Sequence, residues 1–233
     1  MLLAILVVCI AAICVWWAIR VGRQIGYFLP APTNAYEQFH RDALRKLKWR
    51  FFDEFYCNRF RNEGVARFAW AIPNQEAISA IINTVPPNVK GTIVDLGAGS
   101  GFWPMLLSRQ ISEQKRNIKI VAFEKSLNLY AKRKDGSIGI RGAKGAKRSD
   151  LWFNVQPGDE DVMVRLQRSD RIHTLVLIWP PCWEDMAFEA VQAFNGDIVV
   201  YVGEERGGCT VGSFSHPYYF TKLKSTQWRK WRK

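Results

Sequence analysis

Cysteine is too scarce and too irregularly spaced in this chain of 233 residues to build a metal site or a disulfide framework. Five cysteines are present, which is an odd number, and none stands in the paired spacing typical of a bound metal. We therefore expect no metal, and reduced thiols as in a cytosol-like compartment. The cysteines are Cys9, Cys14, Cys57, Cys182 and Cys209.

Acidic residues are also in the minority. The chain has 21 Asp and Glu against 33 Lys and Arg, which gives a formal net charge of +12. A strongly basic protein favours acidic partners, namely nucleic acid, anionic lipid or an acidic substrate. The hydrophobic content of 48% is ample for a core, and the length suits one ordinary domain with a small extra element.

Charge is absent from Leu2–Ile19, and Arg20 and Arg23 close this apolar run. As a helix it spans about 27 Å, close to the hydrocarbon thickness of a bilayer. We expect an uncleaved transmembrane anchor with its interfacial flank over residues 1–29. A cleaved signal peptide is the alternative, but no basic residue precedes the run and residues 15–18 form a poor cleavage site. The basic flank on the C-terminal side predicts a cytosolic domain.

Residues 30–71 form a basic, aromatic connector after the proline-rich break at residues 30–34. Apolar side chains recur every three to four residues from Phe39 to Phe55, which predicts an amphipathic helix. Two placements stay open for this helix. It lies on an anionic leaflet beside the anchor, or its apolar face packs on the domain that follows.

Residues 72–233 alternate strands and helices, which predicts an α/β fold with a doubly wound, mostly parallel sheet. The apolar runs Leu175–Ile178 and Ile198–Val200 are typical of central strands buried on both faces. The expected strands are 92–96, 118–123, 152–155, 174–179 and 197–202, and the expected helices are 73–82, 103–114, 128–133, 161–166 and 184–194.

A glycine-rich turn follows the first expected strand. Asp95 ends an apolar run, Gly97, Gly99 and Gly101 follow at alternate positions, and a mostly apolar helix begins at Phe102. Glycine permits positive φ and close approach of a ligand, and a helix N-terminus offers unpaired N–H donors. This arrangement predicts a nucleotide site. A dinucleotide fingerprint would run Gly-x-Gly-x-x-Gly or Ala, and Phe102 stands where its last small residue is required.

The turn resembles the first motif of class I S-adenosylmethionine-dependent methyltransferases, an acid followed by Gly-x-Gly-x-Gly. The resemblance implies a Rossmann-like fold that binds S-adenosylmethionine. It places Asp95 near the amino-acid part of the cofactor and Gly97, Gly99 and Gly101 beneath it. Glu124, at the end of the second expected strand, matches the family's second motif, an acid that holds the ribose hydroxyls.

Asp159 corresponds more weakly to an acid that the family often has near the adenine. The resemblance covers about residues 71–228. Glycine-rich turns between a strand and a helix also occur in folds that bind no ligand, so a bare scaffold remains the alternative.

After the fourth expected strand the chain departs from the family. Methyltransferases that act on exocyclic amines have Asp, Asn or Ser before Pro-Pro and an aromatic residue, and here Trp179 precedes Pro180 and Pro181. Indole offers one donor and no acceptor, so it cannot take a proton from an amine. Two interpretations remain for Trp179 and Trp183: they stack on a flat or cationic substrate, or they only wall a pocket.

Trp179, Glu184 and Glu204 are the candidate catalytic residues, and Tyr201 joins Pro180, Pro181 and Trp183 in the expected substrate pocket. Glu184 lies beside Asp185 at the start of the next helix, where either carboxylate can instead cap that helix. Glu204 can act as a general base or hold a substrate cation, or it forms a salt bridge to a basic side chain.

Residues 132–148 and 229–233 are basic regions that suit an anionic membrane surface better than nucleic acid, because no recognition motif for nucleic acid accompanies them. We therefore expect a membrane-anchored, cytosol-facing S-adenosylmethionine-dependent methyltransferase of unknown acceptor. One alternative is an inactive scaffold that links a membrane to an acidic partner or a macromolecular assembly. Another is a nucleic-acid methyltransferase at a membrane. The segments 68–73, 97–101, 179–181 and 203–210 together are also similar to a group of uncharacterised methyltransferase-like proteins.

Overall fold

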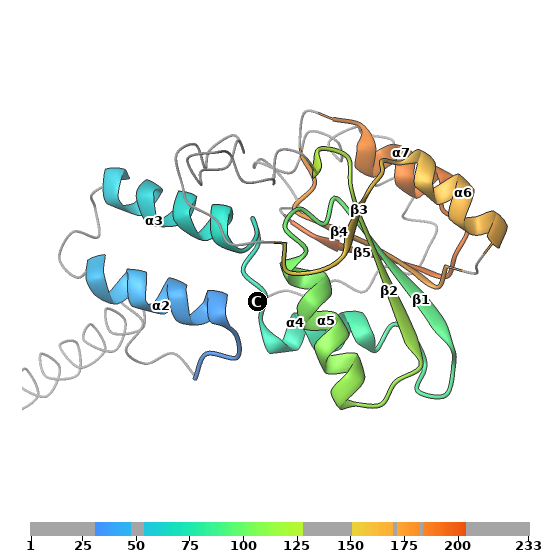
Figure 1. The fold of residues 1–233 in the computed structure, drawn as a ribbon, viewed down its shortest axis with the longest axis horizontal. Helices are drawn as coiled ribbons and strands as arrows, with labels where there is room; N and C mark the ends of the chain where they lie inside the picture. The colour runs from blue at the N-terminus through green and yellow to red at the C-terminus, as the bar shows by residue number, and fades with distance from the viewer. Residues whose placement is uncertain (1–30, 48–53, 128–150, 170–171, 182–183, 204–233) are drawn as a thin grey trace, which may run out of the picture.

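The computed structural model describes residues 31–47, 54–127, 151–169, 172–181 and 184–203 (Figure 1). In these residues five parallel strands form one sheet in the order β3-β2-β1-β4-β5. The predicted α/β class with a parallel sheet is confirmed. The strands are β1 (Gly91–Leu96), β2 (Ile118–Glu124), β3 (Val155–Pro157), β4 (Thr174–Ile178) and β5 (Ile198–Val202).

The strand order reverses at β1, which pairs with β2 on one side and β4 on the other. In open α/β sheets a ligand binds at such a reversal, beyond the carboxyl ends of the strands. The glycine turn follows β1 and therefore lies at this position. The helices are α2 (Ala35–Leu47), α3 (Glu54–Arg67), α4 (Gln75–Ile82), α5 (Phe102–Glu113), α6 (Asp161–Ser169) and α7 (Met186–Ala193).

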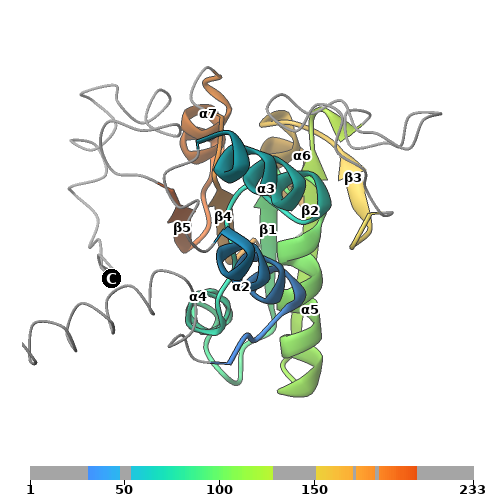
Figure 2. The ribbon, with the colours of Figure 1, turned by 90° about the vertical axis from the view of Figure 1, so that its left-hand side faces the viewer.

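Two buried clusters cover the two faces of the sheet. One joins α2, α4 and α5 to the sheet through Ile93 and Val176, and the other joins α6 and α7 to it through Val94 and Leu96. The two views of the ribbon agree with this division, with α4 and α5 lying away from α6 and α7 (Figures 1 and 2). Because side chains alternate along a strand, Asp95 shares the α5 face with Ile93.

Most predicted elements match the structure within two residues, but two strand predictions were wrong. The third strand begins at Val155, not at Trp152, because Trp152 instead packs its ring among other aromatic side chains outside the sheet. In β4, Leu175–Leu177 are fully buried as predicted, whereas the side chains of β5 are only half-buried. Among the described strands β5 pairs with β4 alone and so stands at the end of the described strand order.

The connector contains two described helices, α2 and α3, which lie side by side. Tyr36 and Ala43 of α2 are buried, and Tyr36 belongs to the cluster that α4 and α5 form. The apolar face of α2 therefore packs on the domain, which was one of the two placements predicted for the connector.

No helix among the described residues is long and apolar enough to cross a membrane. The predicted anchor at residues 2–19 lies outside the described residues. So do the predicted helix 128–133 and the basic regions 132–148 and 229–233.

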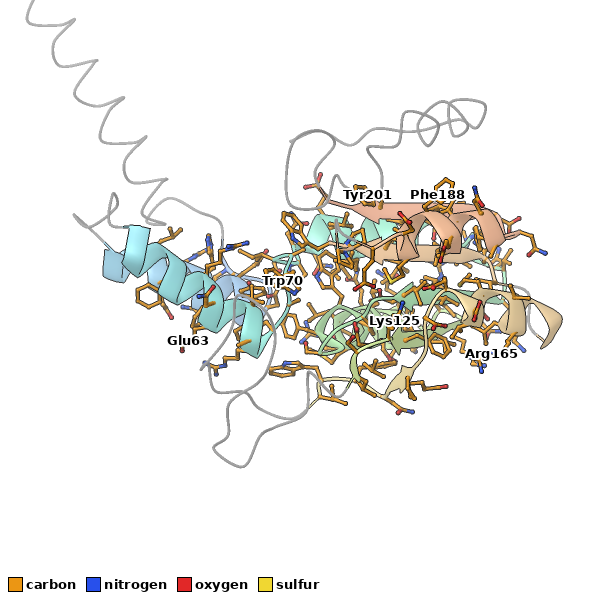
Figure 3. All side chains as sticks on the ribbon, turned by 90° about the horizontal axis from the view of Figure 1, so that it is seen from above. Glu63, Trp70, Lys125, Arg165, Phe188 and Tyr201 are labelled. Atoms are coloured by element: carbon orange, nitrogen blue, oxygen red, sulfur yellow. The ribbon has the colours of Figure 1, made fainter. Side chains whose placement is uncertain are left out.

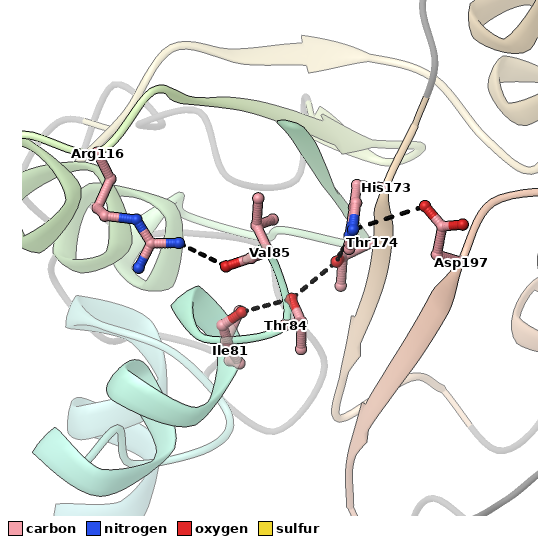
Figure 4. Close-up of polar contacts among 7 residues, drawn as sticks. All are labelled: Ile81, Thr84, Val85, Arg116, His173, Thr174 and Asp197. Atoms are coloured by element: carbon pink, nitrogen blue, oxygen red, sulfur yellow. Dashed lines mark hydrogen bonds and ion pairs between the residues drawn. The ribbon is translucent and has the colours of Figure 1, made fainter. Parts of the chain in front are cut away.

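A chain of polar contacts ties α4 to the amino-terminal end of the sheet (Figure 4). Thr84 Oγ1 lies 2.6 Å from Ile81 O and 2.8 Å from Thr174 Oγ1, and Thr174 Oγ1 lies 3.2 Å from His173 Nδ1. A hydroxyl carries one hydrogen, so once Thr84 donates to Ile81, Thr174 must donate to Thr84 and accept from His173. His173 Nε2 lies 3.6 Å from Asp197 Oδ2 at the other end of the chain.

Replacing either Thr84 or Thr174 should lower the free energy of unfolding by more than half of the loss caused by replacing both. Thr84→Val leaves the buried Thr174 hydroxyl without its acceptor, and Thr174→Val leaves the half-buried Thr84 hydroxyl with Ile81 O alone, so each should lower the free energy of unfolding by about 1–2 kcal/mol. The double variant removes both hydroxyls, so its loss should be smaller than the sum of the two single losses. Urea unfolding of the four proteins measures the coupling. Strict additivity would contradict a stabilising hydrogen bond between the two hydroxyls.

Candidate functional site

The glycine turn depends on backbone conformations that other residues seldom adopt. Gly97, Gly99 and Gly101 have φ values of 82°, 55° and 79°, all in the left-handed region. An L-residue with a Cβ is strained in this region, which explains glycine at three alternate positions. The chain thereby reverses sharply between Leu96, the last residue of β1, and Phe102, the first residue of α5.

The N–H groups of the turn point back into the protein. Gly97 and Ala98 both donate to the carbonyl oxygen of Phe123, each at 2.9 Å. Gly99 donates to Oε2 of Glu124 at 3.0 Å. The end of β2 therefore takes up the first three N–H donors of the turn. A phosphate group would need these same donors.

Glu124 joins the turn to the end of β2. Its Oε2 accepts the Gly99 N–H and its Oε1 accepts the Ser126 N–H at 3.0 Å, which leaves acceptor capacity on each oxygen. Burial raises the pKa of Glu124, and the nearby charge of Glu184 adds to the rise, although the two backbone hydrogen bonds oppose it. A carboxylate held by two N–H groups has a fixed orientation.

Asp95 lies beneath the turn on the same face of the sheet as Glu124. Its backbone is in register with Ala122, two residues before Glu124, so the two carboxyl side chains project to one side. Asp95 is 1% exposed, and neither carboxyl oxygen has a hydrogen-bond partner among the described residues. Burial raises the pKa of Asp95 to about 8, with a further contribution from the charge of Glu124.

The three glycines differ in what surrounds them. A Cβ at Gly101 would lie 2.8 Å from Cβ of Phe153 and from Cγ2 of Val155, whereas a Cβ at Gly97 would meet only the end of Met186, at 3.4 Å. Gly101 is therefore required both for its φ and for close packing. Gly97 is required mainly for its φ.

Acidic side chains gather at the carboxyl end of the sheet around Lys125, which Figure 3 labels. Lys125 Nζ lies 3.9 Å from Glu160 Oε1 and 3.9 Å from Glu184 Oε2. Both ion pairs are partly exposed, so each adds little stability. Glu184, a candidate base, is thus half-exposed and forms an ion pair with Lys125. Asp185 occupies the N-cap position of α7, but its side chain makes no capping hydrogen bond.

Trp179 immediately follows β4 and has an unusual backbone conformation. Its φ is 54°, which is strained for a bulky residue, and its N–H donates to Val202 O at 2.7 Å. Its ring packs against the core cluster on the α5 face, and Pro180 is buried beside it while Pro181 is half-buried. Trp183 and Glu204 lie outside the described residues.

The remaining predicted residues are Asp159 and Tyr201, and Asp159 follows Gly158, whose N–H donates to Glu124 O at 3.3 Å. Asp159 Oδ1 accepts the Asp161 N–H at 3.3 Å, at the start of α6, so it takes part in a turn of its own. Tyr201 pairs with Leu177 in the sheet and packs with the cluster under α6 and α7. That is the face opposite to Asp95.

The sequence analysis gave no structural role to three residues that lie in the turn or contact it: Ser100 in the turn, and Phe68 and Trp152 against it. Ser100 donates its hydroxyl to Phe68 O, and Trp152 donates its backbone N–H to Ser100 O at 2.9 Å. The sequence shows Ser100 as a small polar residue between two glycines, and this pattern does not identify Phe68 as the residue that it contacts.

A cavity of about 10 Å³, enough for one water, lies between α4 and α5. It is lined by Thr33, Asn34, Gln75, Ile78, Leu106, Arg109 and Gln110, none of which belongs to the candidate site. No group of His, Cys, Asp and Glu among the described residues is arranged to hold a metal ion. Compared with known proteins, the chain matches no protein-family model and no curated protein.

Alanine at Gly101 should destabilise the protein more than alanine at Gly97. The φ values are nearly equal, so the backbone strain of about 1–2 kcal/mol is shared. Gly101→Ala adds a steric conflict with Phe153 and Val155 worth about 1–3 kcal/mol more. Thermal and urea unfolding of both variants measure the difference. Equal losses would show that the packing at Gly101 relaxes freely.

Stability should fall as pH rises from about 4 to about 8 because of Asp95. The unfolded chain loses this proton near the ordinary pKa of about 4, whereas the folded protein keeps it until its pKa of about 8. Between these values the folded state binds more protons, so the unfolding free energy falls by up to about 1.4 kcal/mol per pH unit.

The Asp95→Asn variant has no ionisable group at this position, so its free energy of unfolding should fall less between pH 5 and pH 8. Relative to the unaltered chain, the variant should therefore be more stable at pH 8 than at pH 5. Urea titrations at the two pH values provide the measurement. Asp42→Asn, at an exposed acid on α2, is the control and should leave the slope unchanged. An unchanged slope in Asp95→Asn would contradict the buried, protonated carboxyl.

Proposed function

We propose that the chain is a methyltransferase that binds S-adenosylmethionine at the glycine turn. The observation that carries the proposal is the pair Asp95 and Glu124, buried side by side beneath a left-handed glycine turn. The resemblance of the motif in sequence and the reversal of strand order at β1 support the same site.

The residues present fit this cofactor in two respects. Glu124 keeps acceptor capacity on both oxygens, which suits the two adjacent hydroxyls of a ribose. Asp95 has two buried oxygens to which no described residue donates, and the amino group of the cofactor's methionine part would supply donors and a positive charge. A buried carboxyl without a partner is costly unless a ligand or a proton satisfies it.

A phosphate-bearing nucleotide fits the same residues poorly. The N–H groups of Gly97, Ala98 and Gly99 already have acceptors, so they do not form a phosphate cradle. Ionised carboxyls at the turn would repel a pyrophosphate, whereas the sulfonium and ammonium charges of S-adenosylmethionine would favour the ionised form of Asp95, which the free protein keeps protonated up to about pH 8. This contrast favours the methyl donor over a dinucleotide.

When bound, S-adenosylmethionine supplies the methyl group that is transferred. The chain's own residues would bind and orient: Glu124 and Asp95 fix the cofactor, and Trp179 walls the neighbouring strand end. In a methyl transfer, alignment of the methyl donor with the acceptor contributes most of the rate enhancement. A base is needed only if the nucleophile arrives protonated, and Glu184 is the candidate with described surroundings.

The proposal includes a membrane anchor at residues 2–19 with the domain in the cytosol, and it leaves the acceptor open. These parts rest on the sequence. An anionic lipid surface remains favoured over nucleic acid as the partner of the basic regions.

Isothermal titration of S-adenosylmethionine into the full chain, held in a detergent micelle or nanodisc, tests the cofactor. We expect binding, and about 10- to 100-fold weaker binding in Glu124→Gln because hydrogen bonds to a charged acceptor are lost. Glu113→Gln is the control, since Glu113 is exposed on α5 and pairs only with Arg109 among the described residues. It should bind as the unaltered chain does.

Two outcomes would count against the proposal. No heat and no thermal stabilisation with S-adenosylmethionine would favour the inactive scaffold. Tighter binding of NAD than of S-adenosylmethionine in the same assay would assign the turn to a dinucleotide.

A further inference from the structure

The short segment Arg67–Ala71 lies against the glycine turn, and we call it the brace. Three side chains donate to its backbone carbonyls. Ser100 Oγ donates to Phe68 O, Trp103 Nε1 to Ala71 O at 3.0 Å, and Trp152 Nε1 to Arg67 O at 2.8 Å. All three donors come from the turn, from the first residues of α5, or from the segment that packs on Gly101.

Ser100 is held from two sides. Its hydroxyl bonds the brace, and its carbonyl oxygen accepts the backbone N–H of Trp152 at 2.9 Å. Ser100 is 3% exposed and stands between two glycines with positive φ. Substituting its side chain would therefore release the turn from the brace without touching the carboxyl pair of the candidate site.

Aromatic rings connect the brace to the N-terminal helices. The Phe68 ring stacks on Tyr36 of α2 at 4.8 Å between centroids and on Trp152 at 5.8 Å. The Phe102 ring meets Phe68 edge-on at 5.1 Å and Trp152 at 5.1 Å. Figure 3 shows α2 and α3 set to one side of the sheet, with Trp70 of the brace at their junction with it.

The turn needs such external support. Three glycines in left-handed conformations lose more conformational freedom on folding than any other residues would. Within the turn itself the hydrogen bond is Gly101 N–H to Ala98 O at 2.9 Å. Its other anchors lie on β2, on the brace and on the backbone N–H of Trp152. The bonds to β2 hold Gly97, Ala98 and Gly99, so the brace alone holds the Ser100 side chain.

We infer that the brace is a positioning element: Ser100 is a positioning residue that fixes the glycine turn, and Tyr36 and Phe68 couple the packing of α2 to it. The consequence for cofactor affinity rests on the proposed function. The ordering of the turn by the brace does not, and it is measured separately.

Hydrogen–deuterium exchange of the full chain tests the ordering. Ser100→Ala should speed exchange about 5- to 10-fold in the peptide covering Gly97–Gly101, with β4 unchanged, because the loss of one buried hydrogen bond has about this effect on a local opening equilibrium. Thr84→Val is the control, since it also loses a hydroxyl that donates to a backbone carbonyl, at a half-buried position away from the turn. It should leave the turn unchanged.

Tyr36→Leu tests the coupling by removing the ring that stacks on Phe68, and it should speed exchange in the same turn peptide. Gln38→Ala, at an exposed position of the same helix, should not. If Ser100→Ala and Thr84→Val raise exchange equally across the sheet, or if Tyr36→Leu leaves the turn unchanged, the inference is overturned.

Titration with S-adenosylmethionine forms the second arm. Ser100→Ala should weaken binding about 5- to 10-fold, while Thr84→Val should bind normally despite its lower stability. If the unaltered chain does not bind the cofactor, the proposed function fails, while the exchange result still tests whether the brace orders the glycine turn. If the chain binds and Ser100→Ala binds equally well, positioning by the brace is refuted.

Discussion

The arrangement of this domain centres on a carboxyl group that the fold keeps away from water. β1 is paired on both sides, α5 covers the face on which Asp95 lies, and the glycine turn closes over its end. Such a position costs stability for a carboxyl group that receives no hydrogen bond from the part of the chain that the structure describes. An apolar residue there would pack without that cost. The carboxyl is therefore better explained by a ligand than by folding, in line with the tendency of strongly shifted groups to mark functional sites.

The direction of the turn's N–H groups determines which ligand this site suits. In a phosphate-binding turn the backbone donors face outward to the anion. Here the donors of Gly97, Ala98 and Gly99 face β2, the carboxyl oxygens of Asp95 have no partner among the described residues, and those of Glu124 keep capacity for further hydrogen bonds. The site consequently offers acceptors and requires donors. Hydroxyl and ammonium groups supply donors, and phosphates at neutral pH mainly accept hydrogen bonds.

The parts of the site that the sequence could predict are local in the chain. The spacing of Gly97, Gly99 and Gly101 and the position of Glu124 after an apolar run depend on periodicities of a few residues, and the structure has the expected elements there. The bond between Ser100 and Phe68 joins residues 32 positions apart through a backbone carbonyl, which leaves no residue pattern. The face on which Tyr201 lies depends on the register of β5 with β4, which composition does not fix.

Trp179 constrains the acceptor side of the proposed reaction. A residue before proline favours extended backbone, yet Trp179 has a φ of 54°, so its conformation is held against local preference. Its N–H bond to Val202 and its packing against the α5-side core hold it there. Strain of this kind clusters at functional sites. An indole fixed at this strand end cannot accept a proton, so a nucleophile presented there must already be deprotonated or must use another base. Glu184 lies on the edge that such a base would occupy, but its ion pair with Lys125 would have to open first.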